Sequence, residues 1–242
     1  MEQGVIETWA EGRGLRLDPS TKERLYGYVE LVHETNKRFN ITGIRDKGGI
    51  METLVIGSLD PFVGTSVLRG TSFVDIGSGA GVPGVPISIL VEGSSGLLVE
   101  SNQKKADFIA SVVADLGLSN LEVVCQRVEG VARDEGRREA FDWILSRAFG
   151  SAYIATEVAA SLLRVNGCFY LYSKEGDRAL DTETLSHAKD LGLSLLLPEK
   201  AGLVVTSGIL LRKFKPTPQA FPRRFATIKR DSRRLNVRSD HA

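Results

Sequence analysis

The residues best suited to bind a nucleotide-like ligand form a glycine-rich loop, residues 77–84, with the sequence Gly-Ser-Gly-Ala-Gly-Val-Pro-Gly. The β-prone residues 73–76 precede it, and the apolar residues 85–91 follow it. Glycine lets backbone approach a ligand closely and adopts positive φ angles, and Pro83 suits the first turn of a helix. The pattern predicts a strand, a loop and a helix, the unit at which open α/β sheets bind such ligands.

Two acids near this loop help to choose between ligand classes. Residues 79–84 match the dinucleotide fingerprint, in which a helix N-terminus faces a pyrophosphate. Asp75 would repel a pyrophosphate, whereas it would favour the ammonium and sulfonium of S-adenosylmethionine. Glu100 follows Gly77 by 23 residues, where an acid would accept hydrogen bonds from ribose hydroxyls. A plain glycine-rich turn with two surface acids is the alternative.

Strands and helices alternate along most of the chain. We expect strands at residues 72–76, 97–100, 121–125, 141–146, 167–173, 193–197 and 209–214, the last with 204–205 in a closing hairpin. We expect helices at 2–13, 19–39, within 46–69, and at 85–91, 103–116, 154–165 and 178–191. This order predicts a mainly parallel seven-stranded sheet whose ligand lies outside the carboxyl ends of its strands. Asp75, Glu100, residues 127–129 and residues 146–149 all fall at those ends.

Charge is distributed unevenly along the 242 residues. The net charge is +1, but residues 1–211 carry a net charge of −7 and residues 212–242 a net charge of +8. Such a split predicts a basic arm that contacts a polyanion, and a solvated tail is the simpler alternative. Cutting the chain after Phe225 is expected to weaken binding of this polyanion and to leave cofactor affinity intact. We expect three parts: a helical leader (1–70), the sheet domain (71–215) and the arm (216–242).

Neither a metal nor a membrane is expected. Three histidines (His33, His187 and His241) and two cysteines show no metal-ligand spacing. Cys125 and Cys168 lie in predicted strands, so buried free thiols and a reducing cytoplasm are expected. The chain has no apolar run near the roughly 20 residues of a membrane span, and its start is unlike a signal peptide.

Taken together, these motifs resemble the RsmG (GidB) methyltransferases of bacterial 16S ribosomal RNA. The resemblance is carried by Asn40-Ile41-Thr42, residues 75–84, Glu100-Ser101 with Lys104-Lys105, Arg127-Val128-Glu129, Ser146-Arg147-Ala148, Lys174 with Gly176, and Phe221-Pro222-Arg223-Arg224. It implies a Rossmann-like S-adenosylmethionine-dependent methyltransferase fold, with helices on both faces of the sheet. It also implies a cytoplasmic enzyme, expected to be a monomer, that methylates N7 of a guanine in 16S RNA, free or in the 30S subunit.

The resemblance also implies residue roles. Gly77 and Val82 would line the methionine side, Glu100 would take the ribose, and Val128 and Glu129 the adenine edge. The full set expected to bind the cofactor is Asp75, Gly77, Gly79, Gly81, Val82, Glu100, Ser101, Val128, Glu129 and Arg147. Arg147 and Lys174 are candidate RNA contacts, Phe149 is either a base-stacking or a core residue, and no residue is expected to act as a catalytic acid or base.

The sequence departs from the family at one place. Leu54 and Gly57-Ser58 stand where the family usually has a His and an Asp-Ser. This departure keeps open an RNA- or ribosome-binding paralogue with an altered target or lost activity. A nicotinamide-dependent oxidoreductase is disfavoured by Asp75, and a small-molecule methyltransferase is disfavoured by the basic arm.

Overall fold

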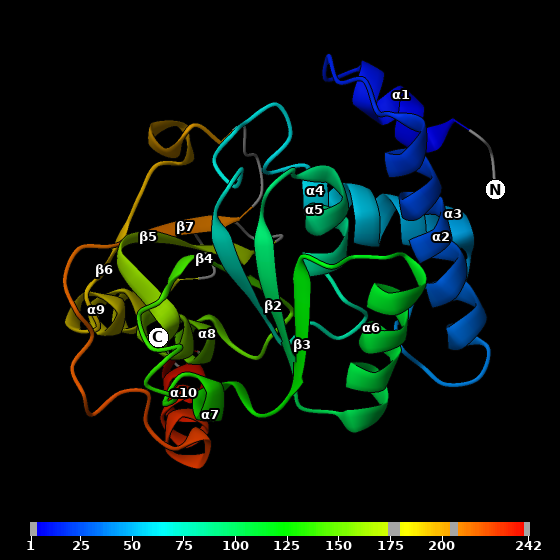
Figure 1. Ribbon diagram of the computed structural model, residues 1–242. Helices are drawn as coiled ribbons and strands as arrows, with labels where there is room; N and C mark the ends of the chain where they lie inside the picture. Colours follow the sequence, from blue (N-terminus) through cyan, green and yellow to red (C-terminus); the bar gives the residue numbers. More distant parts are fainter. Residues whose placement is uncertain (1–3, 174–179, 204–207, 240–242) are drawn as a thin grey trace.

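A seven-stranded sheet forms the centre of the computed structural model, which describes residues 4–173, 180–203 and 208–239 (Figure 1). The strand order is β3-β2-β1-β4-β5-β7-β6, and β7 alone runs antiparallel to its neighbours. The strands are β1 (Ser72–Ile76), β2 (Ser95–Glu100), β3 (Leu121–Cys125), β4 (Phe141–Arg147), β5 (Leu163–Tyr172), β6 (Leu193–Leu195) and β7 (Ile209–Lys213).

The strand order reverses next to β1. The chain runs outward from β1 to β2 and β3, then returns to β4 on the other side of β1. Val74 of β1 therefore pairs with Leu97 on one side and with Ile144 on the other. Ligands of open α/β sheets bind at the carboxyl ends of the strands beside such a reversal. This topology confirms the expected Rossmann-like α/β fold.

Helices cover both faces of the sheet (Figure 1). On one face lie α5 (Gly84–Leu90), α6 (Gln103–Asp115) and the leader helices α1 (Val5–Glu11), α2 (Pro19–Asn36), α3 (Lys47–Ile50), η1 (Met51–Ile56) and α4 (Gly57–Leu59). On the other lie α7 (Val128–Val131), α8 (Ala152–Leu162), α9 (Thr182–Asp190) and α10 (Phe225–Ser239). Successive strand residues face opposite sides, so buried Phe73 packs with the leader while buried Val74 packs with α8.

The leader shares a hydrophobic core with the sheet. Tyr28 of α2 is fully buried, and its hydroxyl donates a hydrogen bond to the carbonyl oxygen of Ala80, 2.9 Å away. The short helix expected within residues 46–69 is a continuous helical stretch, 47–59, that includes a π-helical turn. The leader thus contacts the glycine loop directly. The division into leader, sheet domain and arm stays a prediction.

Several boundaries differ from those expected, most clearly at the start of β5 and the end of β6, and helices α7 and α10 form where no helix was expected. Helix α8 ends at Leu162 and β5 begins at Leu163, whereas the sequence predicted helix to 165 and a strand from 167. Leu163 is extended and pairs with Phe141, and the apolar residues on both sides contain no helix-breaking signal at this boundary. Strand β6 ends at Leu195 instead of Leu197, and a 3₁₀ helix, η3 (Pro198–Ala201), follows. Residues 204–205 of the expected hairpin lie outside the described residues.

Cys125 corrects one expectation about burial. Its side chain is exposed because β3 is the edge strand of the sheet, and Cys168 is half-buried in the interior strand β5. Both thiols are free, as expected. None of the described helices combines the length and the apolar composition that a membrane crossing requires.

Candidate functional site

The glycine loop leaves β1 at the carboxyl edge of the sheet and leads into α5. The amides of Gly77 and Ser78 both donate hydrogen bonds to the carbonyl oxygen of Val99, at 2.8 and 3.1 Å, so β2 fixes the start of the loop. Gly79 has a φ of +57°, and a Cβ added there would meet nothing closer than 3.8 Å. The backbone at Gly79 is therefore open to the approach of a ligand.

Asp75 lies beneath this loop and is fully buried. Its Oδ2 accepts a hydrogen bond from the amide of Gly84, 2.9 Å away, at the start of α5. Its Oδ1 is buried and has no hydrogen-bond partner among the described residues. Burial raises the pKa of Asp75 to about 7, despite the hydrogen bonds that lower it. A second partner for this carboxyl, such as a cationic group, would satisfy the free oxygen.

Glu100 ends β2 and holds the loop from the other side. Its Oε2 accepts from the amide of Gly79 at 2.9 Å, and its Oε1 accepts from the amide of Asn102 at 2.8 Å. Asn102 in turn caps α6 through its side chain, which accepts from the amide of Lys105. Glu100 thus connects the glycine loop to the start of α6, at the position expected for a ribose-binding acid.

Beside Glu100, four of the expected cofactor residues meet in one small cavity. Gly77, Ser101, Val128 and Glu129 line a space of about 60 Å³. Its remaining walls are Val99, Gln126, Arg127, Phe149 and Phe225. Glu129 is largely buried, and its carboxylate makes no hydrogen bond to any part of the chain that the structure describes. An acceptor in this position suits a ligand that carries N–H or O–H groups.

Phe149 fills much of the space above the loop. A Cβ at Gly77 would collide with the Phe149 ring, so the ring packs directly on the glycine backbone. Pockets for drug-sized ligands usually enclose roughly 300–1,000 Å³, far more than this cavity. Phe149 therefore forms a wall of the expected cofactor site, and a nucleoside-sized ligand requires the wall to move.

Arg147 lies apart from this cavity and extends toward the leader. Its guanidinium donates to Ser58 Oγ at 3.0 Å and to the carbonyl oxygen of Thr53 at 2.7 Å. Burial lowers the pKa of Arg147. A Cβ at Gly57 would lie 3.4 Å from Nη2 of Arg147, so the glycine that replaces the family's usual acid stands beside this cation. Arg147 therefore bonds to a hydroxyl and a carbonyl and forms no ion pair with any described acid.

The remaining expected residues take different places. Gly81 has a φ of +89°, and a Cβ there would collide with Val85, so this glycine permits the tight turn into α5. Val82 is half-buried and packs against the core on the α5 side. Lys174 lies outside the described residues.

The chemical groups at this site fit S-adenosylmethionine. The free oxygen of buried Asp75 suits a cation, and the open backbone at Gly79 gives a ligand room. Glu100 and the unbonded carboxylate of Glu129 offer acceptors to ribose and adenine. These features fit the cofactor once Phe149 moves.

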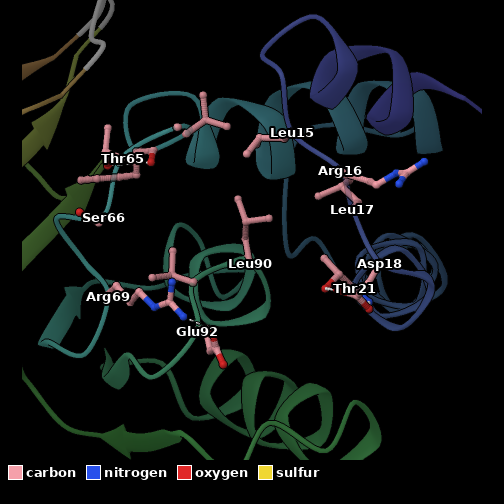
Figure 2. Close-up of a pocket in the computed structure, with 14 residues that line it drawn as sticks. Leu15, Arg16, Leu17, Asp18, Thr21, Thr65, Ser66, Arg69, Leu90 and Glu92 are labelled. Atoms are coloured by element: carbon pink, nitrogen blue, oxygen red, sulfur yellow. Dashed lines mark hydrogen bonds and ion pairs between the residues drawn. The ribbon is translucent and has the colours of Figure 1, made fainter.

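A wider cleft of about 550 Å³ lies at the opposite edge of the sheet, between the leader and the loops that enter β1 and β2 (Figure 2). It contains none of the expected site residues. Arg69 pairs with Glu92 across its lower side, and Arg16 and Asp18 line the other side, so its charges balance (Figure 2). This edge holds the amino ends of the parallel strands, which makes it a poor candidate for the nucleotide site.

One group of potential metal ligands occurs among the described residues, although the sequence spacing predicted none. Glu30, His33 and Glu34 lie on one face of α2, with ligand atoms within 4.8 Å of one another. Lys47 pairs with Glu30 at 2.5 Å, and Lys37 pairs with Glu34 at 2.6 Å. Both acids are thus already neutralised by lysines.

Two residues near the site were not predicted from the sequence. Phe225 reaches the cavity from the C-terminal helix, and Tyr28 reaches the glycine loop from the leader. Both come from segments remote from the loop in sequence, and only Phe225 had a sequence signal nearby, the motif that ends at Arg224. Arg127, which the sequence placed at this edge, lines the cavity and lies against Phe225.

Comparison with known proteins gives a consistent match along the chain. The GidB family, described as rRNA small subunit methyltransferase G, matches residues 21–193. The chain is 30% identical over 228 residues to the ribosomal RNA small subunit methyltransferase G of Trichormus variabilis, covering 90% of this chain and 93% of that one. It is 37% identical over 185 residues to the protein of the same name from Histophilus somni, covering 75% and 82%. Among solved structures, Aeropyrum pernix fibrillarin is similar with a TM-score of 0.49 and 16% identity, over 64% of this chain and 73% of that one.

Proposed function

The chain belongs to the GidB family of rRNA small subunit methyltransferases G, and we propose that it methylates N7 of a guanine in 16S ribosomal RNA. It is an S-adenosylmethionine-dependent rRNA methyltransferase, and the acceptor atom is the proposed part. We propose 16S RNA, free or in the 30S subunit, as the substrate. We also propose that the enzyme is monomeric and cytoplasmic. The observation that carries it is the meeting of Gly77, Ser101, Val128 and Glu129 in one cavity at the strand reversal.

The residues proposed to hold the cofactor lie on three neighbouring strand ends. Asp75 near the end of β1 and the glycine loop that follows would hold the methionine end. Glu100 at the end of β2 and the next residue, Ser101, would hold the ribose, and Val128 and Glu129 after β3 the adenine. When bound, S-adenosylmethionine supplies a methyl group on a sulfonium, which is activated for transfer to a nucleophile.

N7 as acceptor agrees with the side chains at the site. Guanine N7 has an in-plane lone pair and no proton, so its methylation needs no general base. No histidine or cysteine lines the cavity among the described residues. The chain would act by holding the base in line with the methyl group, and such positioning supplies up to about 7–11 kcal/mol of rate enhancement.

Arg147 is the one of the two RNA contacts expected from the sequence that the structure describes. It lies at the end of β4, next to β1, and its guanidinium faces the leader rather than the cofactor cavity. The base has to be unstacked to reach such a site, so an unpaired loop nucleotide is the proposed target. Lys174 remains a proposed RNA contact from the sequence.

The test is transfer of a tritiated methyl group from S-adenosylmethionine into 16S RNA and into 30S subunits, followed by mapping of the modified base. We expect one modified guanine, with the label at N7. Gly79→Val fills the open space above the loop at a positive φ, so it should abolish both cofactor binding and transfer. Label at another atom or in another base would contradict the proposal.

A second measurement tests the absence of a general base. With saturating cofactor and RNA in single turnover, the rate should be flat across neutral pH. A steep profile with an apparent pKa near 6–8 that persists in Asp75→Asn, in which Asp75 can no longer titrate, would contradict N7 as the acceptor. Cofactor and RNA binding without any transfer would instead favour the paralogue that has lost activity.

A further inference from the structure

The C-terminal helix α10 forms one wall of the cofactor cavity. Phe225, its first residue, lines the same cavity as Gly77, Val128 and Glu129. The guanidinium of Arg127, which precedes α7, lies 5.6 Å from the centre of the Phe225 ring. Figure 1 shows α10 next to α7 and α8, below the sheet. This contact bears on the expectation that cutting the chain after Phe225 leaves cofactor affinity intact, because the cut would remove the helix that begins with Phe225.

Specific interactions hold the inner face of α10 on the protein. Ile228 is fully buried, and the hydroxyls of Ser232 and Ser151 lie 2.6 Å apart. Just before the helix, Arg223 donates to the buried carboxylate of Glu157 at 2.6 Å and to Asp231 at 2.8 Å. The helix is thus held against α8 by both apolar and charged contacts.

The outer face of α10 and the residue before it are cationic. The exposed basic residues there are Arg224, Lys229, Arg230, Arg233 and Arg234. Asp231 is the one acid within the described helix, and it already pairs with Arg223 and Arg230. Residues 1–211 carry a net charge of −7 and would repel RNA phosphates. The basic side chains on this face of α10 can neutralise those phosphates.

Phe225 and Phe149 form two walls of the cavity. The cavity of about 60 Å³ is too small for a nucleoside, so the walls formed by Phe149 and Phe225 have to shift when the cofactor enters. Residues on both sides of Phe149 have left-handed backbone, with φ of 59° at Ala148 and 61° at Gly150. Phe225 is the first residue of α10, and the outer face of the same helix is cationic.

From these contacts we infer that Phe225 is a cofactor-pocket residue and that α10 links RNA binding to cofactor binding. RNA phosphates on Lys229, Arg233 and Arg234 would hold the helix in place, and the seated helix would hold Phe225 against the bound cofactor. Linkage requires the effect to be reciprocal, so bound cofactor would also strengthen RNA binding. The inference rests on the proposed function and deepens it.

The experiment measures affinity for S-adenosylhomocysteine by calorimetry, without and with a 16S RNA transcript, on the full-length chain. We expect Phe225→Ala to weaken binding by about fivefold or more, and RNA to tighten binding to the wild type by a similar factor. The triple variant Lys229→Gln, Arg233→Gln, Arg234→Gln should bind the ligand normally alone but lose the tightening by RNA. Phe214→Ala is the matched control, because Phe214 is exposed and follows β7 rather than lining the cavity.

Thermal melts check that each variant is folded, and Phe225→Leu, which keeps apolar contact, should recover part of the affinity. Wild-type affinity in Phe225→Ala, or undiminished tightening by RNA in the triple variant, would overturn the inference. Failure of the wild type to bind S-adenosylhomocysteine is a different result, because it would overturn the proposed function itself.

Discussion

Asp75 shows how one buried residue combines binding and stability. Its carboxyl has one oxygen bonded to the amide of Gly84 and one oxygen without a partner. Burial makes its ionised form costly, which raises its pKa to about 7. When this carboxyl is ionised in the free protein, it destabilises the folded state. A cation bound beside it would remove much of that cost.

The pH dependence of stability tests this property of Asp75. Its folded pKa lies above the ordinary value of 3.8, so the folded chain binds more protons than the unfolded chain between pH 4 and 7, and stability falls as the pH rises through that window. Asp75→Asn keeps an acceptor for Gly84 and cannot ionise. We expect it to be more stable than the wild type above pH 7, by up to about 4 kcal/mol, and similar below pH 4. Urea unfolding from pH 4 to 8 measures this, and a difference that is independent of pH would be the contrary result.

At the scale of elements, helix α2 supports the glycine loop through one hydrogen bond. Tyr28 is fully buried, so its hydroxyl and the carbonyl of Ala80 have no access to water. Burial raises the pKa of Tyr28, and the phenol therefore stays a neutral donor. The leader thereby fixes a loop that the sequence places more than 50 residues away.

Tyr28→Phe would leave the Ala80 carbonyl without a donor. The cost of such an unsatisfied buried acceptor is about 1–3 kcal/mol of unfolding free energy. Affinity for S-adenosylhomocysteine should also fall, since the loop loses a restraint. Tyr26→Phe, which removes a bond from the same helix to Glu7, should leave ligand affinity unchanged. Equal stability of Tyr28→Phe and wild type would show that the bond contributes nothing.

Helix α8 anchors the C-terminal segment through Glu157. Burial pushes the pKa of this carboxyl up, but hydrogen bonds from His187 and Arg223 outweigh burial and lower the pKa to about 2. Because the folded pKa lies below the ordinary value of 4.5, the stabilisation is present above pH 4.5 and is lost as the pH falls toward 2.

Glu157→Gln should therefore lose up to about 3 kcal/mol of stability at pH 7, with the difference shrinking as the pH falls from 4.5 toward 2. Unfolding by urea at several acidic pH values checks this dependence. Hydrogen exchange should also show faster exchange in α10 of this variant at pH 7. Unchanged exchange in α10 would show that other contacts, such as Ile228, hold the helix.

For the whole molecule, the distribution of charge sets how RNA is bound. The acidic net charge of residues 1–211 would repel a polyanion, and the basic C-terminal segment offsets it. The structure gathers several of these cations on one face of α10, at the same side of the sheet as the cofactor cavity. Phosphate contacts are therefore expected near the reacting base rather than on a distant tail.

Salt dependence measures those contacts. In the Lys229→Gln, Arg233→Gln, Arg234→Gln variant, RNA affinity should fall and the slope of its logarithm against the logarithm of salt concentration should become shallower. The slope should change by up to about 0.7 for each phosphate contact to single-stranded RNA that is lost. Lys200→Gln, in η3, is a single-charge control and should leave the slope unchanged. A wild-type slope in the triple variant would mean that other cations make the phosphate contacts.

The sequence by itself determined the order of the seven strands and of most helices, the glycine loop and the residues at the strand ends, but not helices α7 and α10. These are local properties: apolar periodicity, glycine and proline positions, and capping residues such as Asp18 and Asn102 follow from short stretches of chain. They placed Asp75, Glu100, residues 127–129 and residues 146–149 at one edge of the sheet because parallel strands bring their carboxyl ends together. The choice of Gly77, Ser101, Val128 and Glu129 as cofactor residues came from the family resemblance.

Only the tertiary structure decided which of these side chains share a cavity and what closes it. Arg147 turns toward the leader because Thr53 and Ser58 offer it acceptors there, and Phe149 packs on Gly77 because a glycine leaves room for its ring. Phe225 reaches the cavity through packing of α10 on α8, between residues far apart in sequence. Such contacts depend on the summed geometry of several elements, which local pattern does not specify.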